Sequence, residues 1–88
     1  MNIHKTMIHG KCPINGSWDY YEVTIKTKEF IKCEEVEELC DFLRGKTLEQ
    51  ERIADQLHAT IHVKHLLRVE GRHGQNTQLV VELGEPND

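Results

Sequence analysis

The spacing of hydrophobic residues divides the chain into segments with a strand period and segments with a helical period. Residues 20–27 alternate, with Tyr21, Val23 and Ile25 on one face and more polar residues between them. A period of two residues is typical of a strand that is buried on one face. Residues 2–10 show the same pattern more weakly, so we predict two consecutive strands at the start of the chain.

Two helices are predicted next, because hydrophobic residues then recur every three or four positions. The first helix ends at Arg44-Gly45, where a cation and a glycine are typical of a helix C-terminus. The second begins at Thr47, whose hydroxyl and the side chain of Gln50 fit a capping box. The apolar stripes, which we expect to lie in the core, consist of Cys33, Val36, Leu39, Cys40 and Leu43, and of Ile53, Ala54 and Leu57.

Two further strands are predicted from Thr60 onward, where the period returns to two. Residues 71–76 are polar and contain two glycines, so they separate a third strand from a last strand over residues 77–83. The inward positions are Ile61, Val63, Leu67 and Val69 in the third strand, and Leu79, Val81 and Leu83 in the last.

The order strand, strand, helix, helix, strand, strand predicts an α+β fold. Its simplest packing is a four-stranded antiparallel sheet with both helices on one face. Such a sheet leaves two edges unpaired, and a chain of 88 residues buries only a modest core. We therefore expect a homo-oligomer.

Composition limits the class of protein further. The length and the absence of repeats or linkers predict a single domain over residues 1–88. The formal net charge of -4 argues against a protein whose main task is to bind a phosphate backbone. No apolar stretch is long enough to cross a membrane, and the N-terminus lacks the apolar core of a signal peptide. With three cysteines and no export signal, we expect a cytoplasmic protein with free thiols.

The segment between the first two strands contains Asn15-Gly16, a strong signal for a two-residue β-hairpin turn. Counting outward from this turn places Cys12 directly opposite Asp19, on the same face of the sheet. The Cβ atoms of such a pair lie about 5 Å apart. We therefore predict that a thiol and a carboxyl group meet at the end of the sheet.

A thiol beside a carboxyl group can carry out covalent chemistry. The thiolate is a nucleophile, and the carboxyl group can carry a proton to the substrate atom that gains charge. The alternative is structural, with Cys12 a small hydrophobic residue at a strand end and Asp19 a turn residue. The residues by themselves leave both interpretations open.

The stretch Cys12-Pro13-Ile14-Asn15-Gly16-Ser17-Trp18-Asp19 resembles the Cys-Pro-x-x-x-x-x-Asp motif of the 7-cyano-7-deazaguanine reductase (QueF) family and its short QueF-like archaeosine synthases. The resemblance covers about residues 11–83 and includes Asp19-Tyr20-Tyr21-Glu22-Val23 and Leu43-Arg44-Gly45. These proteins belong to the tunnelling-fold superfamily, whose unit has the element order predicted above. The resemblance implies a homo-oligomeric barrel with sites at subunit interfaces.

The resemblance also implies roles for individual residues. In the QueF family the cysteine attacks the nitrile carbon of 7-cyano-7-deazaguanine to form a thioimide, and the aspartate handles the proton on the nitrile nitrogen. These residues correspond to Cys12 and Asp19. The family's His-Glu pair, whose glutamate binds the base, corresponds to Gln50-Glu51, so Glu51 is a candidate for binding the base and Gln50 replaces the histidine. Without the resemblance, Glu51 is a solvated carboxylate of a first helical turn.

The lysine-rich motif that holds NADPH in the reductases is replaced here by Cys33-Glu34-Glu35-Val36-Glu37-Glu38-Leu39. Its carboxylates repel phosphate groups, and no glycine-rich dinucleotide loop occurs elsewhere. The expected enzyme therefore needs no cofactor, and ammonia or another nitrogen donor displaces the thioimide to leave an amidine. We expect the base within tRNA or DNA, although a free base stays open. The alternatives are NADPH-dependent nitrile reduction and an inactive oligomeric binding domain of the same fold.

A nucleic-acid substrate calls for positive potential. The candidate basic face combines residues of the third strand and its flanking segments, and the alternative is an ordinary solvated surface. The residues of this face are His62, Lys64, Arg68, Arg72 and His73.

Six histidines and three cysteines raise the question of a zinc site. The chain has neither Cys-x-x-Cys nor His-Glu-x-x-His. On a strand, His62 and His65 would point to opposite faces. We therefore predict no metal site.

Overall fold

The computed structural model describes residues 1–85. The strands form one antiparallel sheet in the order β1-β2-β3-β4. The predicted α+β class, element order and four-stranded antiparallel sheet are confirmed. The elements are β1 (Asn2–Lys11), β2 (Trp18–Thr27), α1 (Cys33–Asp41), α2 (Gln50–Thr60), β3 (His65–His73) and β4 (Thr77–Gly84).

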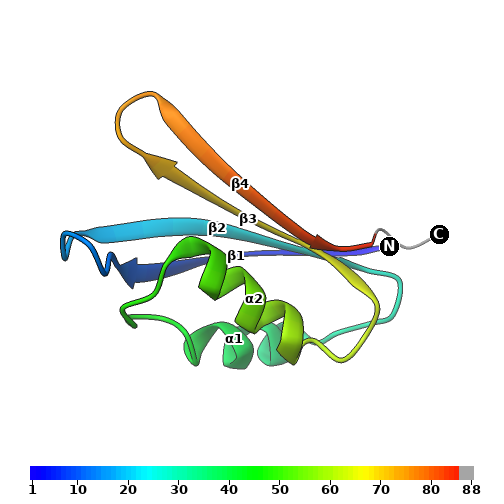
Figure 1. Cartoon of the computed structure of the whole chain (residues 1–88). Coiled ribbons are helices and arrows are strands. Elements are labelled where there is room, and N and C mark those ends of the chain that lie inside the picture. The colour runs from blue at the N-terminus through cyan, green and yellow to red at the C-terminus, as the bar shows by residue number, and fades with distance from the viewer. Residues whose placement is uncertain (86–88) are drawn as a thin grey trace.

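Both helices lie on one side of the sheet (Figure 1), with α1 next to β1 and α2 next to β3 and β4. The apolar face of β2 and β3 packs against them, and the other face of the sheet is polar and exposed at most positions. Neither helix of residues 1–85 combines the length and the apolar character that a membrane crossing requires. The largest fully buried side chains are those of Ile8, Val23, Ile25, Cys40, Leu43, Ile53, Leu57, Leu67, Val69 and Thr27.

The boundary between α2 and β3 differs from the prediction. The expected strand from Thr60 is wrong, because α2 continues to that residue and β3 begins at His65. The Ile61 N–H donates to the Leu57 carbonyl (3.1 Å) and closes the last helical turn. Ile61 is buried all the same, because a connecting segment that lies over the core buries apolar residues without strand pairing. A short alternating run therefore did not distinguish a loop from a strand.

The last strand is only partly covered. Val81 and Leu83 are half-buried and pack against the core, as predicted for inward positions, but Leu79 is 37% exposed. The turn that joins β3 to β4 extends away from the helices (Figure 1).

The cysteines of α1 have different environments. Cys40 is buried, and burial raises the pKa of its thiol to about 11. Cys33 is exposed at the first residue of the helix, so its expected place in the core is wrong. The buried residues of α1 are Val36 and Cys40, so burial begins after the first residues of the helix.

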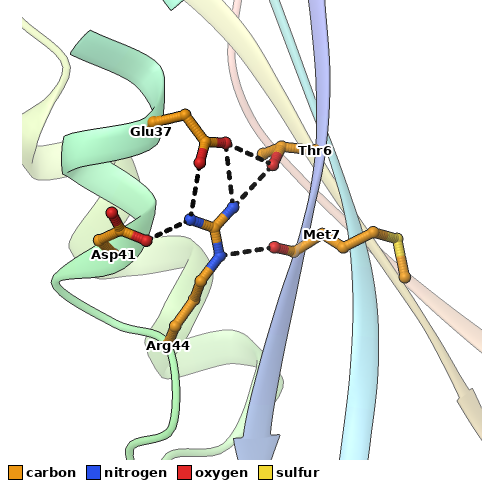
Figure 2. A network of polar contacts seen from close by, with 5 residues as sticks. All are labelled: Thr6, Met7, Glu37, Asp41 and Arg44. Carbon is orange, nitrogen blue, oxygen red and sulfur yellow. Dashed lines mark hydrogen bonds and ion pairs between the residues drawn. The ribbon is translucent and has the colours of Figure 1, made fainter. Parts of the chain in front are cut away.

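Arg44 joins α1 to β1 through a network of polar contacts (Figure 2). Its Nε donates to the Met7 carbonyl (2.9 Å) and its Nη2 donates to the Thr6 hydroxyl (2.8 Å). The same guanidinium group contacts Glu37 and Asp41. Burial lowers the pKa of Arg44, but the hydrogen bonds to Asp41 and Glu37 outweigh this effect and raise the pKa above its usual value.

The predicted basic face does not form one surface. Arg68 lies on the open face of the sheet, where it pairs with Glu70 (2.5 Å) and Glu82 (3.7 Å). His73 lies on the opposite face, and His62 lies in the connection before β3. The charge of Arg68 is therefore balanced locally by carboxylates.

Candidate functional site

The connection between β1 and β2 is longer than the predicted two-residue turn. The Cys12 N–H donates to the Ser17 carbonyl (2.8 Å), so these two residues lie opposite each other and residues 13–16 form the loop. Asp19 lies opposite Gly10. The prediction that Cys12 directly faces Asp19 is therefore wrong by two residues of register.

The loop widens because of Asn15. A type I′ turn needs a positive φ at both central residues. Gly16 has a φ of 73°, but no non-glycine residue among residues 1–85 has a positive φ. Instead, the Asn15 side-chain oxygen accepts hydrogen bonds from the N–H (3.0 Å) and the hydroxyl (2.7 Å) of Ser17. This local contact is an alternative that asparagine offers to a tight turn.

Cys12 and Asp19 nevertheless stay on the same face of the sheet. A register shift of an even number of residues preserves the face of every side chain. The two residues become diagonal neighbours, for which a regular sheet gives a separation of about 7–8 Å. Both side chains are half-buried and lie on the side that the helices cover.

Tyr21 lies next to this pair. Its hydroxyl donates to Asp19 Oδ2 (3.4 Å), and the residue is only 2% exposed. Burial raises the pKa of Tyr21 to about 12, and the charges of Asp19 and Cys12 act in the same direction. At neutral pH the phenol is therefore an uncharged donor that orients the Asp19 carboxylate.

The first residue of α2, Gln50, approaches the same region from the helical layer. It is 3% exposed, and its Nε2 donates to the carbonyls of Val69 (3.0 Å) and Leu79 (2.9 Å). Its Oε1 lies 2.7 Å from His73 Nε2. The predicted capping box is wrong, because Glu49 is the N-cap residue and makes no side-chain cap hydrogen bond. The amide of Gln50 instead bonds to the carbonyls of two strands and to His73, so its polar atoms have partners although the residue is buried.

Gly71 brings the two groups together. A Cβ at this position would lie 2.5 Å from the Tyr21 ring and 2.8 Å from Gln50 Oε1. Tyr21 and Gln50 therefore lie close together over the bare backbone of β3. The candidate site thus combines the Cys12–Asp19–Tyr21 group of the first hairpin with the Gln50–His73 pair.

Three of the four predicted site residues lie in this site, and the fourth is exposed. Cys12, Asp19 and Gln50 lie around Tyr21 and Gly71, as described above. Glu51 follows Gln50 in the first turn of α2 and is exposed. The predicted residues that lie in the site come from the connection after β1, from β2 and from α2.

Two site residues were not predicted. Tyr21 was expected only in the core, yet its place two residues after Asp19 on one strand face was an available signal. His73 was expected in a polar connection with the basic face. Because β3 continues to His73, this residue shares a face with Gly71, and extending the strand period by two residues would have found it.

The site offers a thiol, a carboxyl group, a neutral phenol and an imidazole. Cys12 is half-buried and shares a sheet face with Asp19, whereas Cys40 is a buried thiol with a raised pKa. Within residues 1–85, no group of three or more His, Cys, Asp or Glu side chains converges to hold a metal ion. These groups are suited to nucleophilic attack with proton transfer.

No protein-family model, curated protein or solved structure matches this chain.

Proposed function

We propose that this protein is a QueF-like enzyme that converts the nitrile of a 7-cyano-7-deazaguanine base to an amidine through a covalent bond to Cys12. The observation that supports it is the location of Cys12 and Asp19 on one sheet face, with the Tyr21 hydroxyl hydrogen-bonded to Asp19. The resemblance of the motif between Cys12 and Asp19 supplies the nitrile as electrophile. The base is carried by tRNA or DNA, or is free.

The proposed reaction has two steps and needs neither an oxidant nor a reductant. The Cys12 sulfur adds to the nitrile carbon, and the thiol proton passes through the Asp19 carboxylate to the nitrile nitrogen, which gives a thioimide. Ammonia then adds to the same carbon, the C–S bond breaks, and a proton from the ammonia returns to the sulfur. The net reaction converts the nitrile and ammonia into an amidine. Tyr21 stays neutral and holds Asp19 in place.

In this proposal Glu51 binds the base. Its exposed carboxylate can accept two hydrogen bonds from a guanine-like edge. Gln50 stands where the QueF family has a histidine, and both amide hydrogens of Gln50 are engaged by the carbonyls of Val69 and Leu79. We propose that Gln50 positions His73 through the 2.7 Å contact, so that an imidazole from β3 replaces the missing one.

We further propose that the protein is cytoplasmic, where Cys12 stays reduced, and forms a homo-oligomeric barrel with its sites at subunit interfaces. The outer strand β1 exposes Ile3 (55%) and Met7 (47%), and the outer strand β4 exposes Val80 (38%). An edge strand with exposed apolar side chains pairs readily with another copy. The carbonyls of Met7 and His9 already accept hydrogen bonds from Arg44 and Gly45, so this pairing would use β4 or the first half of β1. Light scattering after size-exclusion chromatography tests this, and a stable monomer at high concentration would contradict it.

Intact-mass measurement tests the covalent step. The protein is incubated without ammonia, in one arm with free 7-cyano-7-deazaguanine and in the other with tRNA that carries this base. We expect an added mass equal to that of the ligand in at least one arm. The adduct should be lost in Cys12→Ala and retained in Cys33→Ala, which removes another accessible thiol. Folded wild-type protein that forms no adduct in either arm would contradict the proposal.

Two further measurements separate the steps. Asp19→Asn should slow adduct formation by about 10²–10⁴-fold, the usual contribution of a positioned proton donor. Adding ammonia to the adduct should release an amidine, identified by its mass. Oxidation of NADPH that depends on the nitrile would instead show that the protein is a reductase.

A further inference from the structure

Two histidine rings meet at the end of α2 that lies away from Gln50. His58 Nδ1 and His65 Nε2 are 2.9 Å apart, and the ring centroids are 4.9 Å apart. His58 belongs to the last turn of α2, and His65 is the first residue of β3. His65 is only 5% exposed, so its ring is held in this position by the fold.

A second contact orients His65. Its Nδ1 lies 2.7 Å from the Val63 carbonyl oxygen. A carbonyl oxygen only accepts hydrogen bonds, so Nδ1 carries the hydrogen, and in the neutral ring Nε2 directs its lone pair toward His58. Histidine ligands of metal ions have this same arrangement, with the second ring nitrogen donating to a carbonyl or a carboxylate.

The pair borders a hollow of about 380 Å³ that is also lined by His62, Lys64 and Glu85. Gly84 keeps this hollow open. Its φ is 91°, and a Cβ there would collide with the His65 carbonyl oxygen and lie 3.5 Å from His58 Cε1. The end of β4 therefore lies directly against the histidine pair without covering it by a side chain.

We propose that His58 Nδ1 and His65 Nε2 bind a divalent late first-row transition metal ion such as Zn²⁺. Imidazole nitrogens suit these ions, with Zn–N distances of about 2.0–2.1 Å. Tetrahedral coordination at these distances separates the two nitrogens by about 3.3 Å, so the 2.9 Å contact needs to open only slightly. Water completes the coordination, because no third His, Cys, Asp or Glu converges with the pair in residues 1–85.

Metal binding replaces the hydrogen bond between the rings without loss of a proton. Neutral His58 moves its hydrogen from Nδ1 to Nε2, and both lone pairs then face the ion. The sequence predicts His62 and His65 on opposite faces of one strand. In the structure His62 lies before β3, so the two residues do not share a strand. The pair that converges is instead separated by a helix end and a connection.

The site would connect the end of α2 to the start of β3. An ion that binds the folded state but not the unfolded one raises the apparent stability by mass action. We therefore expect Zn²⁺ to raise the unfolding temperature of the full chain. This proposal is independent of the proposed reaction at Cys12.

NMR of the histidine ring nitrogens tests the site directly. Zn²⁺ is titrated into uniformly ¹⁵N-labelled full-length protein whose accessible cysteines have been alkylated. The expected result is a shift of the His58 Nδ1 and His65 Nε2 signals that is complete at one equivalent, while the ring of His9 on the open face does not respond. Unchanged signals of His58 and His65 would overturn the proposal.

Variants then measure the contribution of each ligand by calorimetry. His58→Asn should weaken Zn²⁺ binding at least about 100-fold, because loss of even an outer partner of a ligand costs about 10–100-fold. His9→Asn is the matched control and should bind as the wild type does. The buried His65 is a riskier position to change, so the exposed His58 decides the test. Equal affinity of His58→Asn and the wild type would overturn the proposal.

Discussion

Arg44 and Gln50 each tie a helix to the sheet, but they use different kinds of contact. Arg44 joins α1 to β1 through a cation that contacts Glu37 and Asp41, whose side chains are 58% and 65% exposed (Figure 2). Gln50 joins α2 to β3 and β4 through a neutral amide that is almost completely buried. One network is charged and solvated, and the other is neutral and dry.

The comparison explains where the fold can tolerate change. Ion pairs with exposed partners contribute little, because water and salt screen them. A buried amide that donates two hydrogen bonds contributes more, because water and salt do not screen these bonds. The second network also adjoins Tyr21 and Gly71, so the stability of this region and the geometry of the candidate site are coupled.

The largest expected effect follows from removing the neutral network. Gln50→Ala removes the hydrogen bonds to the carbonyls of Val69 and Leu79, which should lower the free energy of unfolding by about 3 kcal/mol. Denaturant unfolding measures this loss. Gln75→Ala, in the exposed turn between β3 and β4, is the control and should change little. Similar stabilities for both variants would contradict the assigned role of Gln50.

Overpacking at the centre of the same region should have the next largest effect. In Gly71→Ala the new methyl group meets the Tyr21 ring at 2.5 Å and Gln50 Oε1 at 2.8 Å, so the free energy of unfolding should fall by about 2 kcal/mol. In Gly10→Ala the nearest atom is 3.4 Å away, at the Lys46 carbonyl, and the loss should be smaller. Thermal unfolding of the two variants compares them directly. The opposite order would show that Tyr21 and Gln50 are not packed over Gly71.

The charged network should respond to substitution more weakly and should depend on salt. Arg44→Lys keeps the charge but loses the planar fork that reaches Met7 and Thr6, which should cost about 1 kcal/mol. Part of this difference should disappear in about 1 M NaCl, where the screening length is about 3 Å. Arg52→Lys on exposed α2 surface is the control. Equal losses for both arginines in denaturant unfolding would contradict the role of Arg44.

The smallest expected effect is a change of stability at alkaline pH. The pKa of Tyr21 is raised to about 12 from 10.0, so the folded protein holds this proton more tightly than the unfolded chain does. This contribution is complete below pH 10 and is lost as the pH rises toward 12.

Between about pH 9 and 10.5, the free energy of unfolding should therefore fall by nearly 1 kcal/mol more for the wild type than for Tyr21→Phe. Denaturant unfolding at several pH values measures this difference. Tyr20→Phe, on the open face, should behave like the wild type over this range. A wild-type protein and a Tyr21→Phe variant with parallel pH profiles would show that the Tyr21 phenol titrates alike in both states.

Much of the fold could be predicted from local patterns. The alternation around Val23 and the helical spacing around Ile53 correspond to elements of the structure, because burial of one face imposes a period on the chain. Element ends were less predictable. The helix α2 continues to Thr60, and Gln50 is not part of a cap because its amide contacts distant strands.

The candidate site was likewise predictable only in part. The face that Cys12 and Asp19 share follows from strand alternation and holds even though the turn is wider than predicted. Their diagonal arrangement depends on whether Asn15 adopts a positive φ or bonds to Ser17, and both are compatible with the local sequence. The structure has the bond to Ser17.

The sequence by itself determined the element order, the buried faces and the motif from Cys12 to Asp19, because these follow from local periodicity and spacing. Only the tertiary structure decided that Gln50 reaches Val69 and Leu79, that His73 joins the site, and that His58 meets His65. These contacts join residues that are at least seven positions apart. Their geometry depends on how the helices lie on the sheet, which no local pattern records.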